Sequence, residues 1–413
     1  MVSESEKSDR RILMLCNDRQ IDRRILLQAD SLQEAGWDVT ILAMPRDEAV
    51  LGDDPRVIRI GTQAEAIAQR ENRVLAVYRL VRRYVPMNGY FMRLLKSAAW
   101  RFVVDQERFY LNLFLNEGRR HPATVVVAHD LPMLAVGRAL ATEFKARLVY
   151  DSHELYCEQE FARWQQKTWA AIEQRHIHAC DQVITVNPSI ARELEKRYGL
   201  DQVCVIHNAE RVGPLPERSH YLREHFGIAS DQRILLFQGG LSAGRNLTEL
   251  VQAMAGLVAS NIHLVILGDG QMAHELKRIV DRQGLNRHVH FHPAVPQTQL
   301  LSITCSADAG VIPYQAICLN NYYCTPNKLF EFVSAGLPIL ASDLPELRRL
   351  VHEQQIGSVA DLSTVSRLTQ AISEFFSDDI RLQTWRGTLK TVRQEMSWQH
   401  EGEKLKQIYE EFR

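Results

Sequence analysis

The sequence lacks the features that mark a membrane-spanning or secreted protein. No apolar run reaches the length of a transmembrane helix. The first residues, Met1 to Arg11, are polar and charged and contain no apolar stretch typical of a signal peptide. The 7 cysteines are scattered, odd in number and form no C-x-x-C pair, which argues against a zinc site and against a disulfide framework. We therefore expect the protein to lie in the reducing cytoplasm.

An excess of charge of either sign is also missing. The 49 Lys and Arg residues nearly balance the 50 Asp and Glu residues, so the net charge is −1 and nothing global points to nucleic acid. The apolar fraction of 46% is ordinary for a globular protein. At 413 residues the chain has room for two domains of ordinary size.

Short apolar segments alternate with stretches of helical periodicity along the whole chain. This alternation predicts βαβ units in parallel sheets, and the segments are too many for one small sheet. The expected strands are 11–16, 39–43, 124–128, 147–150, 182–186, 203–207, 234–238, 263–267, 289–291, 309–312 and 339–342. We predict two Rossmann-like, doubly wound α/β domains, 1–208 and 209–395, because Val212–Pro216 interrupts regular structure. Ligands of such sheets bind at the carboxyl ends of the strands.

The segment 325–346 contains one acid in unusual surroundings. Glu331 lies in an otherwise apolar helical run, 329–335, which Gly336 ends before a further strand begins after Pro338. A carboxylate in a buried helix is costly unless something satisfies it, and acids in dinucleotide sites bind ribose hydroxyls. A helix-capping or helix-dipole role is an equal alternative for this residue.

This segment, Thr-Pro-Asn-Lys-Leu-Phe-Glu-Phe-Val-Ser-Ala-Gly-Leu-Pro-Ile-Leu-Ala-Ser, resembles the family 4 glycosyltransferases, whose pattern is roughly P-x-K-x-F-E-Y-x-A-x-G-x-P-V-V-A-S. The resemblance extends along nearly the whole chain. It implies the GT-B fold, with two domains facing across a cleft and a C-terminal helix, 396–413, that crosses back onto the first domain and is docked by Trp398 and Tyr409. It also implies retaining transfer from a nucleotide sugar without metal or cofactor, and it assigns Glu331 to the donor ribose.

A glycine-rich loop, Gly239–Asn246, follows a predicted strand and precedes a predicted helix, 247–257. Its glycines allow backbone amides to approach a phosphate, the helix N-terminus favours an anion, and Arg245 can pair with it. A turn with a solvated arginine is the alternative. In the resembled family an arginine follows the first glycine of this loop. Gly240 stands there instead, so Lys328 is expected to supply the missing cation.

Further donor contacts are implied by the resemblance. They are Gly268, Asp269, Gly270, Val295 and Asn327. A simple strand-to-helix turn explains the first three residues as well as a nucleotide contact does. The acid that binds the donor sugar in the resembled family is absent, because Tyr323 stands at its position. We expect other hydrogen-bonding groups of the segment 320–328 to take over that role.

Two polar clusters end neighbouring strands of the first domain. One is His129 with Asp130, and the other is Asp151 with His153 and Glu154. A single His–Asp pair is usually structural, but two clusters at adjacent strand ends predict a site. The resemblance places His153 beside the donor sugar and the acceptor, where a neutral imidazole would orient the acceptor hydroxyl or share its proton. We predict catalytic roles for His153, Asp151 and His129 and acceptor binding by Asp130 and Glu154; a two-histidine metal site is disfavoured for want of partners.

Charged residues also follow the first strand. Asp18, Arg19 and Arg24 either bind an acceptor, such as its phosphate, or lock the loop internally, and we assign the first two to the acceptor. Residues 70–101 hold eight basic residues against one acid, with aromatic residues among them. That pattern is typical either of a helix on an anionic membrane surface or of a core-packed helix with a basic exposed face.

These observations predict a glycosyltransferase that moves a sugar from a nucleotide sugar to a hydroxyl of a glycan or lipid-linked acceptor. Its place would be polysaccharide or glycolipid assembly, at the inner face of the plasma membrane as a peripheral protein. Two alternatives stay open. One is a nucleotide-sugar 2-epimerase of related fold, and the other is a non-catalytic relative in a glycan-assembly complex, which Tyr323 in place of the family acid would suit.

Overall fold

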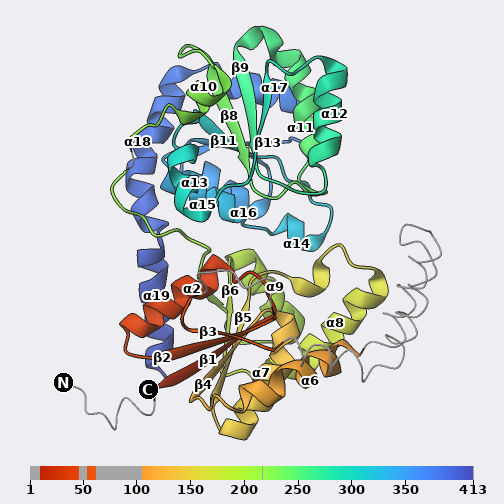
Figure 1. Cartoon of the computed structure of the whole chain (residues 1–413), viewed down its shortest axis with the longest axis vertical. Coiled ribbons are helices and arrows are strands. Elements are labelled where there is room, and N and C mark those ends of the chain that lie inside the picture. The colour runs from red at the N-terminus through yellow and green to blue at the C-terminus, as the bar shows by residue number, and fades with distance from the viewer. Residues whose placement is uncertain (1–9, 46–53, 62–104, 216, 413) are drawn as a thin grey trace. The chain divides into compact units, whose positions relative to one another are not determined.

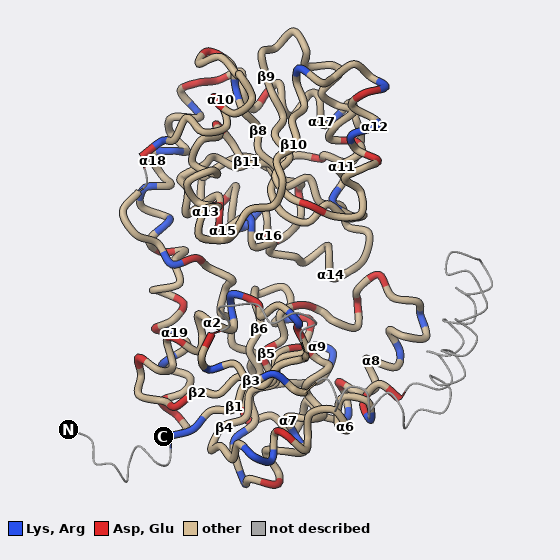
Figure 2. The backbone as a smooth tube through the Cα atoms, viewed as in Figure 1, with Lys and Arg blue, Asp and Glu red and all other residues tan. Residues whose placement is uncertain are grey.

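The computed structural model describes residues 10–45, 54–61, 105–215 and 217–412, which form two compact units (Figure 1). Unit 1 contains the chain up to Ile206 and again from Gly402, and unit 2 runs from His207 to Glu401. The basic segment 70–101 lies outside the described residues. Over the described ranges, no helix is both long and apolar enough to cross a bilayer. Figure 2 shows basic and acidic residues mixed in both units, in keeping with the net charge of −1.

Unit 1 is a doubly wound unit on a seven-stranded parallel sheet of order β3-β2-β1-β4-β5-β6-β7. The strands are β1 (Arg11–Cys16), β2 (Asp38–Ala43), β3 (Val57–Arg59), β4 (Val125–His129), β5 (Arg147–Ser152), β6 (Gln182–Thr185) and β7 (Cys204–Val205). The helices are α2 (Arg23–Glu34), α6 (Gln106–Gly118), α7 (Leu131–Phe144), α8 (Arg163–His176) and α9 (Pro188–Tyr198). The strand order reverses between β1 and β4, so a ligand site is expected at their carboxyl ends.

Unit 2 repeats this plan with a six-stranded parallel sheet of order β10-β9-β8-β11-β12-β13. The strands are β8 (Arg233–Gln238), β9 (Ile262–Leu267), β10 (Val289–His292), β11 (Ala309–Ile312), β12 (Ile339–Ser342) and β13 (Gly357–Ala360). The helices are α10 (Tyr221–Phe226), α11 (Leu247–Ala253), α12 (Ala273–Gln283), α13 (Gln297–Thr304), α14 (Leu319–Tyr322), α15 (Asn327–Ser334), α16 (Pro345–Leu347), α17 (Val365–Phe376) and α18 (Asp379–Glu395). The order reverses between β8 and β11.

The two Rossmann-like units confirm the predicted fold class. Buried strands of parallel sheets carry continuous apolar runs, which is why segments such as β1 and β12 were readable from the sequence. Two edge strands were not predicted. The three residues of β3 are all only half-buried, and β13 has the sequence Gly-Ser-Val-Ala, so neither has a run of large apolar residues.

The last helix, α19 (Trp398–Glu410), begins in unit 2 and continues into unit 1. Within unit 1, the buried ring of Tyr409 meets Trp37 edge-on at 6.2 Å. Trp398 was predicted to help dock the helix on the first domain, and the structure describes its contacts within unit 2. It belongs to unit 2, where it is buried and its backbone N–H donates to the carbonyl of Glu210 at 2.7 Å.

Candidate active site

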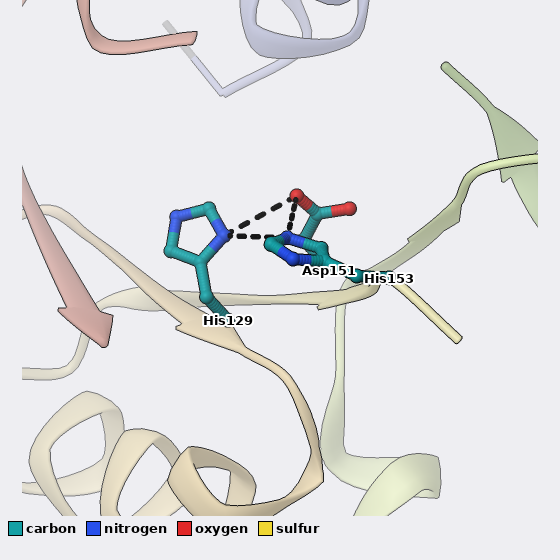
Figure 3. A group of neighbouring side chains, drawn as sticks. All are labelled: His129, Asp151 and His153. Carbon is teal, nitrogen blue, oxygen red and sulfur yellow. Dashed lines mark hydrogen bonds and ion pairs between the residues drawn. The ribbon is translucent and has the colours of Figure 1, made fainter. Parts of the chain in front are cut away.

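In unit 1, three predicted site residues converge at the carboxyl ends of β4 and β5 (Figure 3). His153 Nε2 lies 3.1 Å from Asp151 Oδ2, and His129 Nδ1 lies 3.2 Å from the same oxygen. The two imidazoles approach each other at 3.3 Å. The other ring nitrogen of His153, Nδ1, lies 3.4 Å from Asp130 Oδ2, and the backbone N–H of His153 donates to Asp130 Oδ1 at 3.0 Å. His153 therefore has a carboxylate at each ring nitrogen.

Helix α2 holds Asp151 from the other side. Arg24 donates to both carboxylate oxygens, at 3.1 and 2.8 Å, and Gln28 donates to Oδ2 at 2.6 Å. Arg24 is 3% exposed and Asp151 is fully buried, so this is a bidentate ion pair removed from solvent. Arg24 also donates to the carbonyl of Ile206 at 2.6 Å. Of the two roles predicted for Arg24, the internal one is confirmed, since its buried guanidinium has no free face for an acceptor phosphate.

These contacts set the protonation states of the cluster. Burial alone would favour neutral groups, but the charge of Arg24 holds the pKa of Asp151 well below its usual range. Burial works against the charge of His153 as well, yet the facing carboxylates of Asp130 and Asp151 raise its pKa to about 9. Burial lowers the pKa of His129, so that ring is neutral, and burial raises the pKa of Asp130 to about 7. His153 is thus an imidazolium at neutral pH, which corrects the expectation of a neutral ring.

The same three residues group like metal ligands. One ligand atom from each of His129, Asp151 and His153 lies within 4.8 Å of the others. The guanidinium of Arg24 and the amide of Gln28 already bond to the Asp151 oxygens, however, and a buried cation beside the site repels a divalent ion. The donor set therefore fits a hydrogen-bonded charge network better than a metal centre.

The other residues predicted for the acceptor lie near this cluster. Asp18 follows β1, and its carboxylate accepts from the thiol of Cys16 at 3.5 Å. Burial raises its pKa, and the charge of His153 lowers it. Arg19 follows β1 too, but its Nη1 donates to the carbonyl of Pro45 at 3.3 Å. Glu154 accepts a hydrogen bond from Gln159.

In unit 2, the predicted glycine turns are required by contact between two loops. Gly268 and Gly270 have φ of 147° and 155°, and a Cβ on them would lie 2.0 Å from the Gly239 carbonyl and 2.4 Å from the Leu241 carbonyl. Side chains there would force the loops after β8 and β9 apart. Asp269 braces the turn by accepting from the N–H of Gly270 at 2.7 Å. Loop packing thus accounts for both glycines by itself.

Two cations lie where the unit 2 sheet reverses its strand order. The Lys328 ammonium lies over the ring of Phe237, a residue of β8, at 3.6 Å from the ring centroid. It lies 5.0 Å from the ring centroid of Tyr314, which follows β11. It is buried and its Nζ has no hydrogen-bond partner within the described chain. Arg245 lies over the other aromatic, Tyr314, at 4.1 Å. Burial and then the charge of Arg245 depress the pKa of Lys328 well below its usual value.

Gly239 leaves room beside this ammonium. Its φ is 113°, and a Cβ there would lie 3.4 Å from Lys328 Nζ. Gly240, at the next position, is exposed and a Cβ on it would meet nothing within 4 Å. Burial and the charge of Arg245 disfavour the protonated form of Lys328, and an anion that approaches through the glycine turn would favour it.

Glu331 is oriented by a relay from two neighbouring elements. The side-chain amide of Gln238, the last residue of β8, donates to Glu331 Oε2 at 2.5 Å. The side-chain oxygen of the same amide accepts from the hydroxyl of Thr304, in α13, at 2.9 Å. Glu331 and Thr304 line a pocket of about 210 Å³ together with Glu210, Arg211, Gln297, Thr298, Leu300, Leu301 and Ser334. The pocket combines apolar side chains with a fixed carboxylate, as small-ligand sites do.

The remaining predicted donor residues are more loosely associated. Val295 is half-buried against the core of unit 2. Asn327, at the start of α15, accepts from the amide of Asn208 at 3.1 Å. Tyr323 directly follows the short α14, whose last residue, Tyr322, is 39% exposed. The sequence analysis did not identify Gln238, Thr304 or Gln28 as site residues. Gln238 could have been noticed as the polar residue that ends the apolar strand β8.

Each of the two units matches a family of known protein domains. Residues 21–209 match the glycosyl transferase 4-like domain, and residues 220–389 match the glycosyl transferases group 1. The chain belongs to the family 4-like, group 1 glycosyltransferases. Among curated glycosyltransferases it aligns with an uncharacterized one of Methanocaldococcus jannaschii at 24% identity over 241 residues, 55% of this chain and 59% of that protein. It aligns with D-inositol 3-phosphate glycosyltransferase of Xylanimonas cellulosilytica at 22% identity over 255 residues, 57% of this chain and 58% of that protein. The chain therefore spans less than two thirds of these relatives' own length.

Solved glycosyltransferase structures share the fold over the whole chain. Sucrose-phosphate synthase from Thermosynechococcus elongatus superimposes with a TM-score of 0.73 at 18% identity, over 97% of this chain and 99% of that one. HepE of Anabaena, solved in complex with UDP and glucose, gives a TM-score of 0.69 at 14% identity, over 97% and 99% of the two chains. The family match and these structures confirm the GT-B type of fold.

Proposed function

We propose that this glycosyltransferase transfers a sugar from a nucleoside diphosphate donor to an acceptor hydroxyl. The observation that carries the proposal is the unpartnered Lys328 ammonium, buried beside Arg245 and the Gly239 turn where the unit 2 sheet reverses. A diphosphate is the ligand that satisfies two adjacent cations at such a strand end. HepE, which has the same fold, was solved with UDP and glucose.

The donor fits unit 2 from its nucleoside to its diphosphate. The carboxylate of Glu331 accepts hydrogen bonds from ribose hydroxyls, with Gln238 fixing its orientation. The apolar wall of the same pocket, with Leu300 and Leu301, takes up the nucleoside. Arg245 and Lys328 neutralise the charge that develops on the diphosphate as the sugar leaves, which is electrostatic stabilisation by groups already in place.

The acceptor reacts at the His153 cluster of unit 1. Asp130 and His153 titrate as a pair, and the Asp130 carboxyl, with a pKa of about 7, is suited to take the hydroxyl proton near neutral pH. Asp151 keeps His153 protonated and in place, and Arg24 and Gln28 hold Asp151 in turn. The transfer proceeds with retention at the anomeric carbon and needs no metal, as the resemblance to family 4 implies.

Arg245→Ala should weaken UDP binding by about 1.5–3 kcal/mol, because a charge-assisted contact with the diphosphate is lost. Isothermal titration calorimetry on the full chain measures the change. Arg278→Ala is the matched control, since Arg278 is an exposed arginine of α12 in the same unit. Equal UDP affinity for Arg245→Ala and the parent protein would remove the phosphate assignment.

We further propose that the protein is cytoplasmic and that its segment 70–101 contacts anionic membrane. The proposal rests on the basic and aromatic composition of that segment and on seven free cysteines. Binding to vesicles containing phosphatidylglycerol should then fall with salt and on replacement of Arg79, Arg82 and Arg83 by glutamine. Equal co-sedimentation with neutral and anionic vesicles would refute an electrostatic membrane role.

A further inference from the structure

Three arginines near the unit 1 cluster bond to groups of the protein itself. Arg24 is buried and bonded to Asp151 and to the carbonyl of Ile206. Arg19 donates to the carbonyl of Pro45, and Arg59 donates to the carbonyls of Met44 at 3.1 Å and Asp18 at 3.4 Å. The guanidinium groups of these three arginines are thus engaged with backbone oxygens or with a carboxylate.

Carboxylates dominate the surroundings of His153 instead. Asp130 and Asp151 contact its two ring nitrogens, and the charges of Asp18 and Glu154 both act on Asp130. Against these four acids stand two cations, the buried guanidinium of Arg24 and the half-buried imidazolium of His153. The electrostatic field of the cluster is therefore negative, which favours hydroxyl donors and opposes an anion.

Two further features fit a sugar ring at this cluster. The Nε2 atom of His129 is buried without a hydrogen-bond partner in the described structure, and Figure 3 shows it on the side of the ring that points away from Asp151. Tyr156 is half-buried, packs edge-on against Trp169 at 5.0 Å, and lies near enough to Asp130 for the charge of that carboxylate to act on it. Carboxylates, an unsatisfied imidazole nitrogen and aromatic rings together match the hydroxyl-rich edges and apolar face of a pyranose or cyclitol ring.

We propose that the ring bearing the reacting hydroxyl of the acceptor is an uncharged sugar or cyclitol, and that unit 1 rejects the same ring when it carries a phosphate. This inference rests on the proposed function, because it takes the His153 cluster to be the acceptor site. It concerns only the reacting ring. A charge elsewhere on the acceptor, such as the phosphate of a lipid carrier, is not opposed by this cluster.

The test compares ring pairs that differ only by a phosphate. Glucose with glucose 6-phosphate, and myo-inositol with myo-inositol 1-phosphate, are titrated into the full chain labelled with ¹³C-histidine, at constant ionic strength and without donor. The imidazole resonances of His153 and His129, assigned with His153→Gln and His129→Gln, report occupancy. The neutral member of at least one pair should shift these resonances until they saturate. The half-saturating concentration of its phosphate should be at least about tenfold higher, because the phosphate and the carboxylates of the partly buried site repel each other. A phosphate that binds as well as its neutral partner, or no shift with any ring, overturns the proposal.

Asp18→Asn tests the cause of the discrimination. Removing this carboxylate should lower the ratio of the affinity for the neutral ring to the affinity for its phosphate by about threefold or more, because one repulsive charge is lost. Asp38→Asn, an exposed acid at the start of β2, is the control and should leave the ratio unchanged. An unchanged ratio in Asp18→Asn contradicts the electrostatic explanation. Titration of the same sample with UDP measures binding to unit 2 alone. A lack of UDP binding would therefore contradict the proposed function and not this inference.

Discussion

His153→Ala should lower kcat by about a hundredfold or more, the usual effect of losing a group that positions or transfers a proton. The imidazolium faces Asp130 at 3.4 Å and Asp151 at 3.1 Å, so its removal takes a cation from both carboxylates, although Asp151 keeps its ion pair with Arg24. The affinity for UDP should hardly change, because Glu331, Arg245 and Lys328 belong to unit 2. Steady-state kinetics measures kcat and calorimetry measures the affinity for UDP. Glu331→Ala should show the reverse pattern, with weaker UDP binding and a nearly unchanged kcat.

The pH dependence gives a second test of the same residue. In the parent protein kcat should rise through a pH of about 7, as the Asp130 carboxyl loses its proton, and fall above about 9, as His153 loses its charge. His153→Ala should lose the fall on the alkaline side. His178→Ala, an exposed histidine of unit 1, is the control and should keep both limbs. A His153→Ala enzyme with unchanged kcat and the same pH profile would remove His153 from the mechanism.

Asp151→Ala should destabilise unit 1 by about 3–5 kcal/mol, since it leaves the buried guanidinium of Arg24 without a counter-charge. Urea unfolding of the full chain, followed by circular dichroism, measures the loss. The carboxyl of Asp151 has a depressed pKa in the folded state. Its contribution to stability is therefore complete above the unfolded pKa of about 3.9 and disappears as the pH falls below that value. The difference between the two proteins should shrink in acid.

Two variants show whether the cost arises from the unpaired charge. The double replacement Arg24→Met with Asp151→Leu should recover at least half of the lost stability, because buried ion pairs can be replaced by apolar groups of similar volume. Glu143→Ala breaks the exposed pair with Arg119 and should cost less than about 1 kcal/mol. If Asp151→Ala costs no more than Glu143→Ala, the Arg24–Asp151 pair does not hold the cluster together.

The sequence predicted the two sheets well because buried parallel strands carry apolar runs that end in polar residues. The same reasoning located His129 and His153, since residues that end adjacent strands meet at one edge of a sheet. It could not show that Arg24 pairs with Asp151, because the two residues are 127 positions apart and the contact depends on how α2 packs on the sheet. Nor could it show the charge of His153, which follows from two carboxylates at its ring nitrogens.

In unit 2 the outcome was similar. The segment 325–346 identified Glu331, and Gly336 indeed ends its helix with a φ of 69°. The relay through Gln238 and Thr304 was not predictable, because an amide and a hydroxyl carry no pattern in the sequence that indicates a shared partner. Lys328 was named as a substitute cation, but its burial between two aromatic rings became visible only in the structure.

The most direct measurement is the ratio of nucleoside diphosphate released to glycoside formed. The purified full chain is incubated with UDP-glucose or GDP-mannose and a panel of neutral glycan and polyprenyl-linked acceptors, with and without EDTA, and the anomer of the product is read by NMR. The account predicts one nucleoside diphosphate for each glycosidic bond, release that rises with acceptor, retained configuration and no effect of EDTA. Conversion of the donor sugar without any acceptor, or no turnover of donors that calorimetry shows to be bound, would contradict it.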